Sequence, residues 1–502
     1  MPRPPLEIDD RTPLDGSRID LPARIGWLLR VWRIHRGLSL RELQARMADL
    51  GTSTSVTALS RVEVSGERNS TLIEGYERGL GLPYGALRAP IDILCRTYEY
   101  RPVDVAPLPA PTSLDAFSTV CAAVLDPDAR PTGSDWMRFA EAHTDGTFGL
   151  PHQQMAPVVE RLASELARAG GVSYQQRYDA LARLRCGRYA DVVFEVASAS
   201  VDRPGAQRLA GVVCAVCERP SVEVLDWAAE RLDSPCYLIA RAACLGLQNL
   251  RYVGGIDERQ WAAVAPRFVA AAGLAAADPQ RGAVLSSTLA ASHPALRGAV
   301  PPEVRQLLPQ PSRPPHWTRT RLNAHYTAAG ELAAEVAAGR PGETLLTRLL
   351  FEALYDFRAA HAATSSFLIA ASPFASATVD AAARLAGTEV DDLTRSRLRD
   401  LFGNLMSSTD GPAVQALLAS TDPHRVGFGL RVVAMAGQAP SGPRVRELLD
   451  SDVTREDAML AAGLAQHPVL RELAEDPDVA AEVREAADWW LRTGGRIVDP
   501  AA

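Results

Sequence analysis

The sequence predicts an all-α protein, with a small helical domain at the N-terminus followed by an α-solenoid of helical pairs. Apolar residues recur every three or four positions through most of the chain, and the alternation typical of strands is nearly absent. Short breaks containing Asp-Pro, Ser-Pro or glycine separate these amphipathic segments. Helices that each bury one face against a neighbour are expected to stack as repeated pairs.

Composition divides the 502-residue chain into six expected segments. The first, 1–20, has no apolar core and no cleavage-like site, so it is typical of a disordered tail and not of a secretion signal. The others are a helical domain at 21–100, a proline-rich linker at 101–113, a helical-repeat region at 114–299, a proline-rich break at 300–316 and a second helical-repeat region at 317–495.

The first two helices of the N-terminal domain are indicated by their spacing and by their ends. In 21–35, apolar residues fall on one helix face, and Gly37 ends the segment. Ser39 precedes the second helix, 40–50, and Glu42 completes a capping box, in which each side chain bonds to the other residue's backbone amide.

Three more helices are expected after Gly51. The four hydroxyl side chains of 52–55 can cap a third helix, which covers about 55–62. A fourth helix at 71–80 and a fifth at 84–95 again place apolar residues on one face. Five short helices so close together predict a compact all-α domain.

The third helix has side chains suited to reading DNA. A helix that enters the major groove needs short polar residues at its exposed N-terminal end, beside a helix that crosses the DNA backbone. Arg61 is expected to bond to guanine, and Val56 or Thr57 to contact a thymine methyl. The remaining candidates are expected to hold phosphates or adjoin the bases. The whole predicted set is Arg41, Thr52, Ser53, Thr54, Ser55, Val56, Thr57, Ser60, Arg61 and Arg68.

The N-terminal domain is the basic part of an acidic chain. All 53 basic residues are arginines, and 60 acidic residues give the chain a net charge of −7. The segment from Leu21 to Arg88 contains ten arginines and six acidic residues, which give it a net charge of +4. The overall charge excludes a protein that coats nucleic acid indiscriminately, whereas the local excess suits contact with DNA.

Two stretches of this domain resemble a known family. IGWLLRVWRIHRGLSLRELQARM contains the paired arginines of the first helix and "GLS-x-x-EL" leading into the second, and ALSRVEVSGERNSTLIEGYERGLGLP contains "LSR-x-E-x-x-G-x-R". These marks resemble the Xre/Cro-type helix-turn-helix domain of bacterial transcription regulators, in a longer-turn variant. The resemblance covers only the N-terminal domain and implies binding to a double-stranded DNA operator by a cytoplasmic protein.

A transcription regulator of this kind is expected to be a homodimer. A single small helix in the major groove buries too little surface for tight binding to an operator. A dimer that binds two half-sites related by two-fold symmetry buries twice that surface. The helical-repeat body, HEAT- or TPR-like, would dimerise or sense a small-molecule, peptide or protein effector. The alternative is a helical scaffold whose N-terminal bundle makes protein contacts and does not bind DNA.

The rest of the sequence shows no arrangement typical of an enzyme. There is no P-loop, serine elbow, HExxH motif or paired metal-ligand spacing, so neither catalysis nor a cofactor or metal is expected. Cys214 and Cys217 lie in an apolar helical run without a second pair, which favours structural thiols over zinc or redox chemistry. Seven sparse cysteines also favour a reducing cytoplasm.

One local cluster follows the second proline-rich break. If a helix begins just after the prolines, Trp317, Arg321 and His325 fall near one face and could line a ligand pocket. The alternative is that the aromatic side chain packs at a domain junction while the arginine remains solvated.

Overall fold

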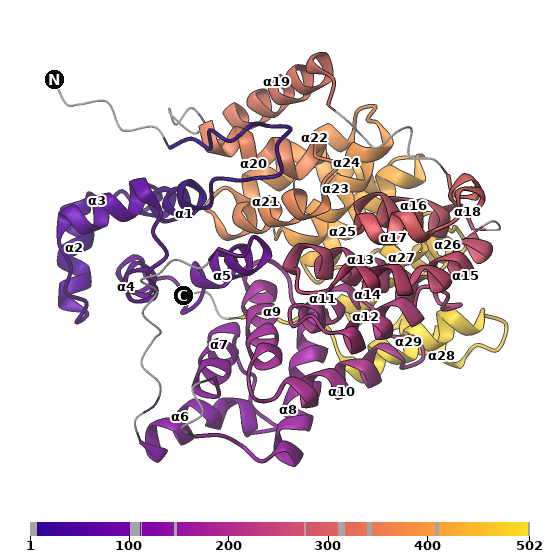
Figure 1. Cartoon of the computed structure of the whole chain (residues 1–502), viewed down its shortest axis with the longest axis horizontal. Coiled ribbons are helices and arrows are strands. Elements are labelled where there is room, and N and C mark those ends of the chain that lie inside the picture. The colour runs from indigo at the N-terminus through magenta and orange to yellow at the C-terminus, as the bar shows by residue number, and fades with distance from the viewer. Residues whose placement is uncertain are drawn as a thin grey trace.

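The computed structural model describes residues 8–100, 111, 113–144, 148–275, 278–309, 317–338, 344–406 and 411–499. Within these ranges it contains 29 α-helices and no strands, so the predicted all-α fold is confirmed. Successive helices pack in pairs over much of the chain, giving a repeat-like arrangement (Figure 1). No helix in the described part has both the length and the apolar character needed to span a membrane.

The N-terminal domain contains the five predicted helices. They are α1 (Leu21–His35), α2 (Leu40–Asp49), α3 (Val56–Ser65), α4 (Ser70–Leu80) and α5 (Arg88–Thr97). The capping box is formed as predicted, because Ser39 accepts from the Glu42 amide and the Glu42 carboxylate accepts from the Ser39 amide. Ser55 caps α3 by accepting a hydrogen bond of 3.1 Å from the amide of Ala58.

The remaining helices form the body of the molecule. The middle of the chain forms α6 (Leu114–Leu125), α7 (Gly133–Ala142), α8 (His152–Arg168), α9 (Gly171–Cys186), α10 (Ala190–Val201), α11 (Ala210–Cys217), α12 (Val222–Glu230), α13 (Tyr237–Val253), α14 (Glu258–Ala263), α15 (Ala265–Ala275), α16 (Pro279–Ala291), α17 (Pro294–Ala299) and α18 (Pro302–Leu307). The C-terminal part forms α19 (Arg319–Val336), α20 (Thr344–Tyr355), α21 (Ala359–Ala371), α22 (Ala375–Ala386), α23 (Asp392–Asn404), α24 (Pro412–Leu418), α25 (Pro423–Met435), α26 (Gly442–Leu449), α27 (Arg455–Leu464), α28 (Val469–Glu475) and α29 (Ala481–Thr493).

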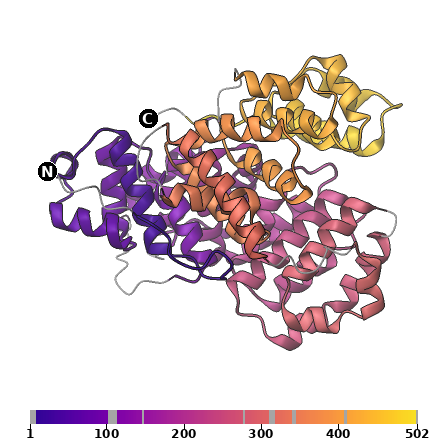
Figure 2. The same cartoon turned by 90° about the horizontal axis from the view of Figure 1, so that it is seen from above.

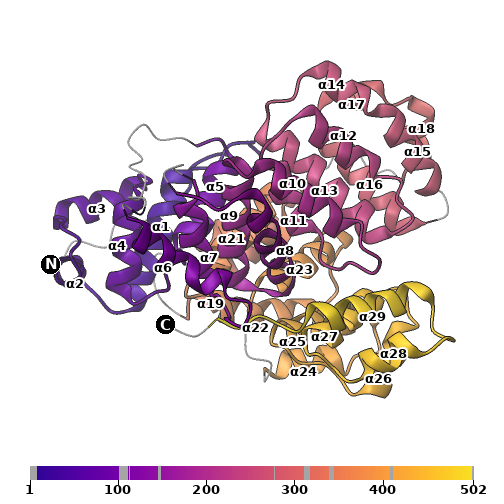
Figure 3. The same ribbon diagram turned by 90° about the horizontal axis from the view of Figure 1, so that it is seen from below.

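The path of the chain differs from a simple solenoid, in which each repeat contacts only its neighbours. After α18 the chain returns to the N-terminal domain, and α21 packs against both α5 and α9 (Figures 1 and 3). The helices α5, α9 and α21 form the centre of the molecule. Two arms, one containing α12–α18 and the other α24–α29, extend from this centre away from the N-terminal domain (Figures 2 and 3). Parts of the two predicted repeat regions therefore pack against each other and against the N-terminal domain.

The N-terminal domain shares a hydrophobic core with the body. One cluster of buried apolar side chains joins residues 8–95 to α19–α25, and another joins the middle of the chain to α25–α29. Of the predicted linker 101–113, only Pro111 and Ser113 lie in the described part. The predicted break at 300–316 contains α18, so it is helical at 302–307, and 310–316 lie outside the described residues.

The expectation of a disordered tail needs correction over residues 8–20. This segment has little regular structure, yet Ile8 and Asp10 are buried against the body. The physical reason is a tertiary ion pair, because Asp10 lies 2.8 Å from the guanidinium of Arg24 on α1. Residues 1–7 lie outside the described part.

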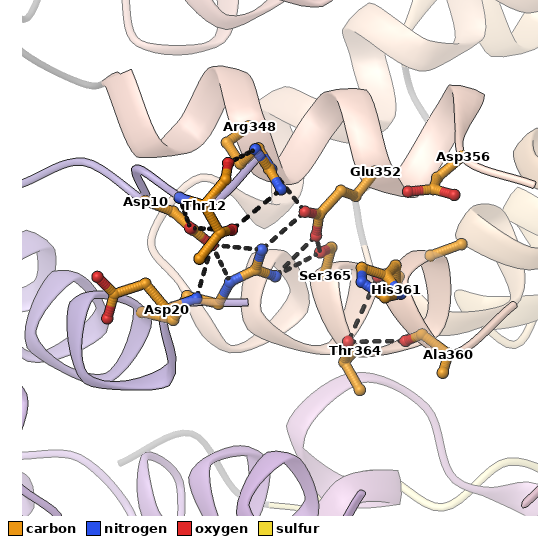
Figure 4. A network of polar contacts seen from close by, with 12 residues as sticks. Asp10, Thr12, Asp20, Arg348, Glu352, Asp356, Ala360, His361, Thr364 and Ser365 are labelled. Carbon is orange, nitrogen blue, oxygen red and sulfur yellow. Dashed lines mark hydrogen bonds and ion pairs between the residues drawn. The ribbon is translucent and has the colours of Figure 1, made fainter. Parts of the chain in front are cut away.

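A buried polar network joins α1 to α20 and α21 (Figure 4). The Glu352 carboxylate receives two bonds of 2.7 Å from Arg24, one of 2.7 Å from Arg348 and one of 2.6 Å from the Ser365 hydroxyl. Arg24 and Glu352 have fully buried side chains. Nearby, Trp32 donates to the carbonyl of Ala371 at 2.7 Å. These contacts fix the orientation of the N-terminal domain on the body.

Gly26 permits the close crossing of α1 and α3. A Cβ atom at this position would lie 2.4 Å from the backbone oxygen of Glu63, which cannot move without shifting α3. We expect Gly26→Ala to lower the free energy of unfolding by about 1–3 kcal/mol, as overpacking does elsewhere.

Gly273 on α15 is the matched control for this substitution. A Cβ atom there has no neighbour within 4 Å among the described residues. Gly273→Ala should therefore stabilise the protein by up to about 1 kcal/mol through helix propensity. Urea denaturation followed by circular dichroism measures both effects, and equal responses of the two variants would contradict the proposed close crossing.

Candidate nucleic-acid interface

Helices α2 and α3 are held in a fixed relative orientation by the rest of the domain. Leu43 and Met47 of α2 and Leu59 of α3 are fully buried. The short connection between the helices is also fixed, since the Thr52 amide donates to the Met47 carbonyl at 2.8 Å and Gln44 donates to the Thr54 carbonyl at 3.3 Å. Hydrogen bonds thus tie the turn to α2, and buried side chains of both helices pack in the domain core.

The buried side of α3 is fixed by a polar clamp around Glu63. Arg33 of α1 donates two hydrogen bonds of 2.6 and 2.7 Å to the Glu63 carboxylate, and the Tyr76 hydroxyl of α4 donates a third of 3.0 Å. Burial, together with the Glu63 charge, raises the pKa of the Tyr76 hydroxyl well above its ordinary value, so it remains a donor. This clamp sets the rotation of α3 and determines which of its residues face outward.

The outward side of α3 carries most of the predicted base-reading residues. Thr57 and Arg61 are exposed, Val56 and Ser60 are partly exposed, and the Arg61 side chain retains 70% of its accessible surface. Arg61 also lies 3.7 Å from Glu67, which is a weak surface pair. These side chains can therefore approach a partner without rearrangement of the helix.

The N-terminal end of α3 is accessible as well. Ser53 and Ser55 are exposed, Thr52 and Thr54 are partly exposed, and Arg41 is exposed on α2. The first amides of a helix lack intrahelical acceptors, so this end can accept an anion such as a phosphate. Nine of the ten predicted residues are therefore exposed or partly exposed on α2, on α3 or in the turn between them.

Arg68 is the exception, and its assignment as a phosphate contact is corrected. Its side chain is buried, lies 2.6 Å from Asp92 of α5 and donates to the Ser70 hydroxyl at 2.5 Å. The buried guanidinium cannot reach DNA without giving up its bonds to the Asp92 carboxylate and the Ser70 hydroxyl. Arg68 joins the segment after α3 to α5 and has a structural role.

Internal ion pairs use much of the basic excess of the N-terminal domain. Arg24 and Arg88 are buried and pair with carboxylates outside 21–88, namely Asp10 and Glu352 for Arg24 and Glu141 for Arg88. Apart from Arg33, which is partly exposed but bound to the buried Glu63, the arginines that reach the surface at least partly are Arg30, Arg36, Arg41, Arg46, Arg61 and Arg78. The acidic residues that do so are Glu42, Asp49, Glu67 and Glu74. The surface of this region is therefore only slightly basic.

The second candidate site, around Trp317, is an aromatic packing cluster. Trp317 and His325 lie together as predicted, with ring centroids 6.1 Å apart. However, Trp317 packs on Phe351 at 5.1 Å and His325 stacks on Tyr355 at 4.6 Å. Arg321 is exposed and pairs with Asp391 at 3.0 Å. The packing alternative fits this geometry, because the aromatic rings fill the space that a pocket would need.

The clamp around Glu63 is a feature that the sequence did not reveal. Arg33 and Glu63 are separated by 30 residues and look like ordinary surface charges of two amphipathic helices. In the sequence, Arg33 and Glu63 each lie next to apolar positions of their helices. Many solvent-exposed residues do the same, so this position did not indicate the ion pair.

Comparisons with known proteins do not assign a family to the chain. No protein-family model matches it, and no curated protein matches it. One similar solved structure is an engineered protein from the Northeast Structural Genomics Consortium, with 14% sequence identity and a TM-score of 0.21 over 76% of this chain and 96% of that one. A likeness this weak carries no argument about function.

Proposed function

We propose that the chain is a sequence-specific DNA-binding transcription regulator that reads the major groove with α3. The observation that carries the proposal is the two-sided character of α3: Glu63 locks its inner side, while Thr57 and Arg61 project from its outer side. Its N-terminal end is capped and accessible, as a groove-entering helix requires. Regulation would take place on DNA in the cytoplasm.

The proposed regulator acts as a homodimer. One reader helix contacts few base pairs, and a second copy related by two-fold symmetry supplies the missing affinity. Because the N-terminal domain shares its core with the body, the body would set the distance between the two reader helices. The expected operator is therefore an inverted repeat of fixed spacing.

Binding-site selection tests the base-reading assignment of Arg61. The purified full-length chain should enrich one motif from a random duplex library. We expect Arg61→Ala to lose roughly 1–3 kcal/mol of discrimination at one base pair and to relax the preference there. Arg41→Ala should weaken binding to all sequences alike, since it removes a phosphate contact.

Arg384 of α22 provides the matched control. It is an exposed arginine on the body, half of whose side chain is accessible and which pairs with Glu335. Arg384→Ala should leave both affinity and sequence preference unchanged. An Arg61→Ala variant that selects the same motif with the same strength at every position would remove Arg61 from the assignment.

The nearly balanced surface charge favours a second candidate, a helical scaffold that does not bind DNA. Apart from Arg33, which is bound to Glu63, six arginines and four acidic residues share the accessible surface of 21–88, so the electrostatic attraction to a phosphate backbone is modest. This scaffold would be supported if no motif is enriched from the library at low salt.

A further inference from the structure

A cavity of about 330 Å³ lies where the N-terminal domain, the middle of the chain and the C-terminal part meet. This centre joins the two arms to the N-terminal domain in Figures 2 and 3. Its lining comes mainly from α5, α9, α11, α13, α21, α23, α25 and α27. None of Trp317, Arg321 and His325 contributes to it, so it is separate from the aromatic cluster.

A cluster of arginines that outnumber their carboxylates adjoins the cavity, and Arg241, Arg431 and Glu456 of this cluster line it. Glu456 of α27 is shared by Arg241, Arg399 and Arg431, at 3.0, 3.1 and 2.9 Å. Asp457, next in sequence, contacts Arg399 and Arg431 at 3.2 and 2.6 Å. Three guanidinium groups thus share two carboxylates and leave one positive charge in excess, apart from the more distant Asp400 of α23.

Asp400 does not remove this excess, because it has a cation of its own. It lies 3.4 Å from Arg397 and 3.8 Å from Arg241. Arg397 also donates to the carbonyls of Asp356 and Phe357, at 2.8 and 3.0 Å, and lines the same cavity. Counting this pair, the cluster still has one more guanidinium than carboxylate.

Arg208 adds a second unbalanced positive charge. Its guanidinium donates to the Ala169 carbonyl at 3.1 Å, and no carboxylate in the described part of the chain lies within ion-pairing distance of it. Burial, with the nearby Arg431, lowers the pKa of the Arg208 guanidinium to about 10. It remains charged at neutral pH, and its side chain is partly shielded from water, so the absence of a counter-ion is costly.

The backbone conformation of Arg208 also indicates a ligand-binding site. Its φ of +51° lies in the left-handed region, which residues with a Cβ atom seldom adopt. Backbone strain of this kind persists where the surroundings impose it, and it is concentrated at ligand-binding sites. The loop before α11 therefore holds the arginine against the cavity at a conformational cost.

Other lining residues of the cavity are apolar or aromatic. Tyr174 of α9 and Phe367 of α21 have ring centroids 6.1 Å apart, and both line the space. Leu245 of α13 lies one helical turn from Arg241 and also lines it, and Ala363 of α21 is exposed toward it. The cavity thus offers both cationic and apolar groups to one occupant.

We propose that this cavity binds a small organic anion whose charged group pairs with Arg208 and Arg431 and whose apolar body contacts Tyr174, Phe367 and α21. A carboxylate or phosphate ester would supply the missing negative charge through charge-assisted hydrogen bonds. The proposal does not depend on DNA binding. Ile93 and Thr97 of α5 line the same cavity, so an occupant would contact the last helix of the N-terminal domain.

Two fluorescent probes that differ in one charged group test the site. Anilinonaphthalene sulfonate is an aromatic anion, and N-phenylnaphthylamine is its neutral counterpart without the sulfonate. The full-length protein should bind one anilinonaphthalene sulfonate molecule with saturation. Arg208→Gln should weaken that binding roughly tenfold or more while changing the affinity for the neutral probe much less, because only the charge-assisted bond is lost.

Arg203→Gln is the matched control, since Arg203 belongs to the same loop but is half exposed and pairs with Glu160. It should leave the affinity for both probes unchanged. Ala363→Trp, at an exposed position of the lining, should abolish binding of both probes by filling the space. Circular dichroism establishes that each variant is folded.

The proposal is overturned by any of three results. These are the absence of a saturable site in the wild-type protein, equal loss of both probes in Arg208→Gln, and unchanged binding of the anion in either Arg208→Gln or Ala363→Trp. Each of these outcomes would mean that the anion binds elsewhere or that the arginine has no part in binding.

Discussion

Replacing Glu352 by alanine should lower the free energy of unfolding by about 3–5 kcal/mol, because it leaves Arg24 buried without its main counter-ion. The Glu352 carboxylate receives two bonds from Arg24 and one each from Arg348 and Ser365, and the Arg24 and Glu352 side chains are fully buried. Asp10 alone cannot compensate two guanidinium groups. Urea denaturation monitored by circular dichroism measures the loss.

An exposed ion pair of the same type is the control for this experiment. Glu335 of α19 pairs with Arg384 of α22, and about half of each side chain is accessible. Glu335→Ala should cost less than about 1 kcal/mol because water replaces the lost partner. Similar losses for the two variants would mean that the buried network does not fix the N-terminal domain on the body.

The same network makes stability depend on acid. Burial alone would raise the pKa of the Glu352 carboxyl, but Arg24 and Arg348 outweigh burial and hold the pKa well below its ordinary value of 4.5. The stability that this group contributes is therefore fully present above that ordinary value. It is lost progressively as the pH falls below it toward the depressed pKa of the folded state.

Two buried histidines should destabilise the protein at higher pH than Glu352 does. Burial lowers the pKa of His143 and of His361 to about 4, from an ordinary value of 6.5. Below pH 6.5 the unfolded chain takes up protons that the folded chain refuses, so stability falls between pH 6.5 and 4. At pH 5 the expected loss is about 2 kcal/mol for each histidine.

The surroundings of His361 explain why protonation is unfavourable. Neither ring nitrogen has a hydrogen-bond partner in the described part of the chain, and the ring packs edge-on against Tyr98 with centroids 5.8 Å apart. Arg358 and Arg24 oppose a further positive charge, whereas Glu352 and Asp356 favour it less strongly than burial disfavours it. The ring is thus held neutral.

His361→Phe should remove about half of the pH-dependent loss that the two histidines cause. Phenylalanine retains a ring of similar size and cannot take up a proton. Thermal unfolding of the variant and the wild type, followed from pH 7 to pH 5, measures the difference. His424→Gln, at an exposed position, should keep the full pH dependence, and a His361→Phe variant with the wild-type dependence would refute this assignment.

Local patterns predicted the helices of the N-terminal domain because their signals lie within a few residues. The Ser39–Glu42 capping box and the Ser55 cap are examples, since each joins residues three apart. The same reasoning predicted the outward face of α3, because apolar periodicity assigns an inner face and leaves Thr57 and Arg61 on the other. An all-α architecture followed from the same periodicity.

Partners distant in sequence could not be predicted in this way. Arg24 and Glu352 are 328 residues apart, and nothing local distinguishes Arg24 from an exposed arginine such as Arg41. Arg68 was assigned to DNA for the same reason, although Asp92 holds it inside. Every basic residue of this chain except histidine is arginine. The residue type therefore does not distinguish arginines that form internal ion pairs from arginines that could bind a partner.

The hydrophobic core that the N-terminal domain shares with the body could not be predicted from the sequence either. A proline-rich segment at 101–113 suggested a boundary, but Trp27 of α1 stacks on Phe374 of the body with ring centroids 6.2 Å apart. An apolar residue on a helix face indicates burial without indicating the partner. The packing of α19–α22 near the N-terminal domain could therefore be recognised only in the structure.

Hydrogen exchange of the full-length chain, with and without its selected DNA duplex, tests the central claim most directly. We expect DNA to protect backbone amides in α2, in the turn 50–55 and in α3, while an unrelated duplex at the same salt protects them much less. Protection absent from these segments, or equally strong with the unrelated duplex, would contradict the claim that α3 is a sequence-reading helix.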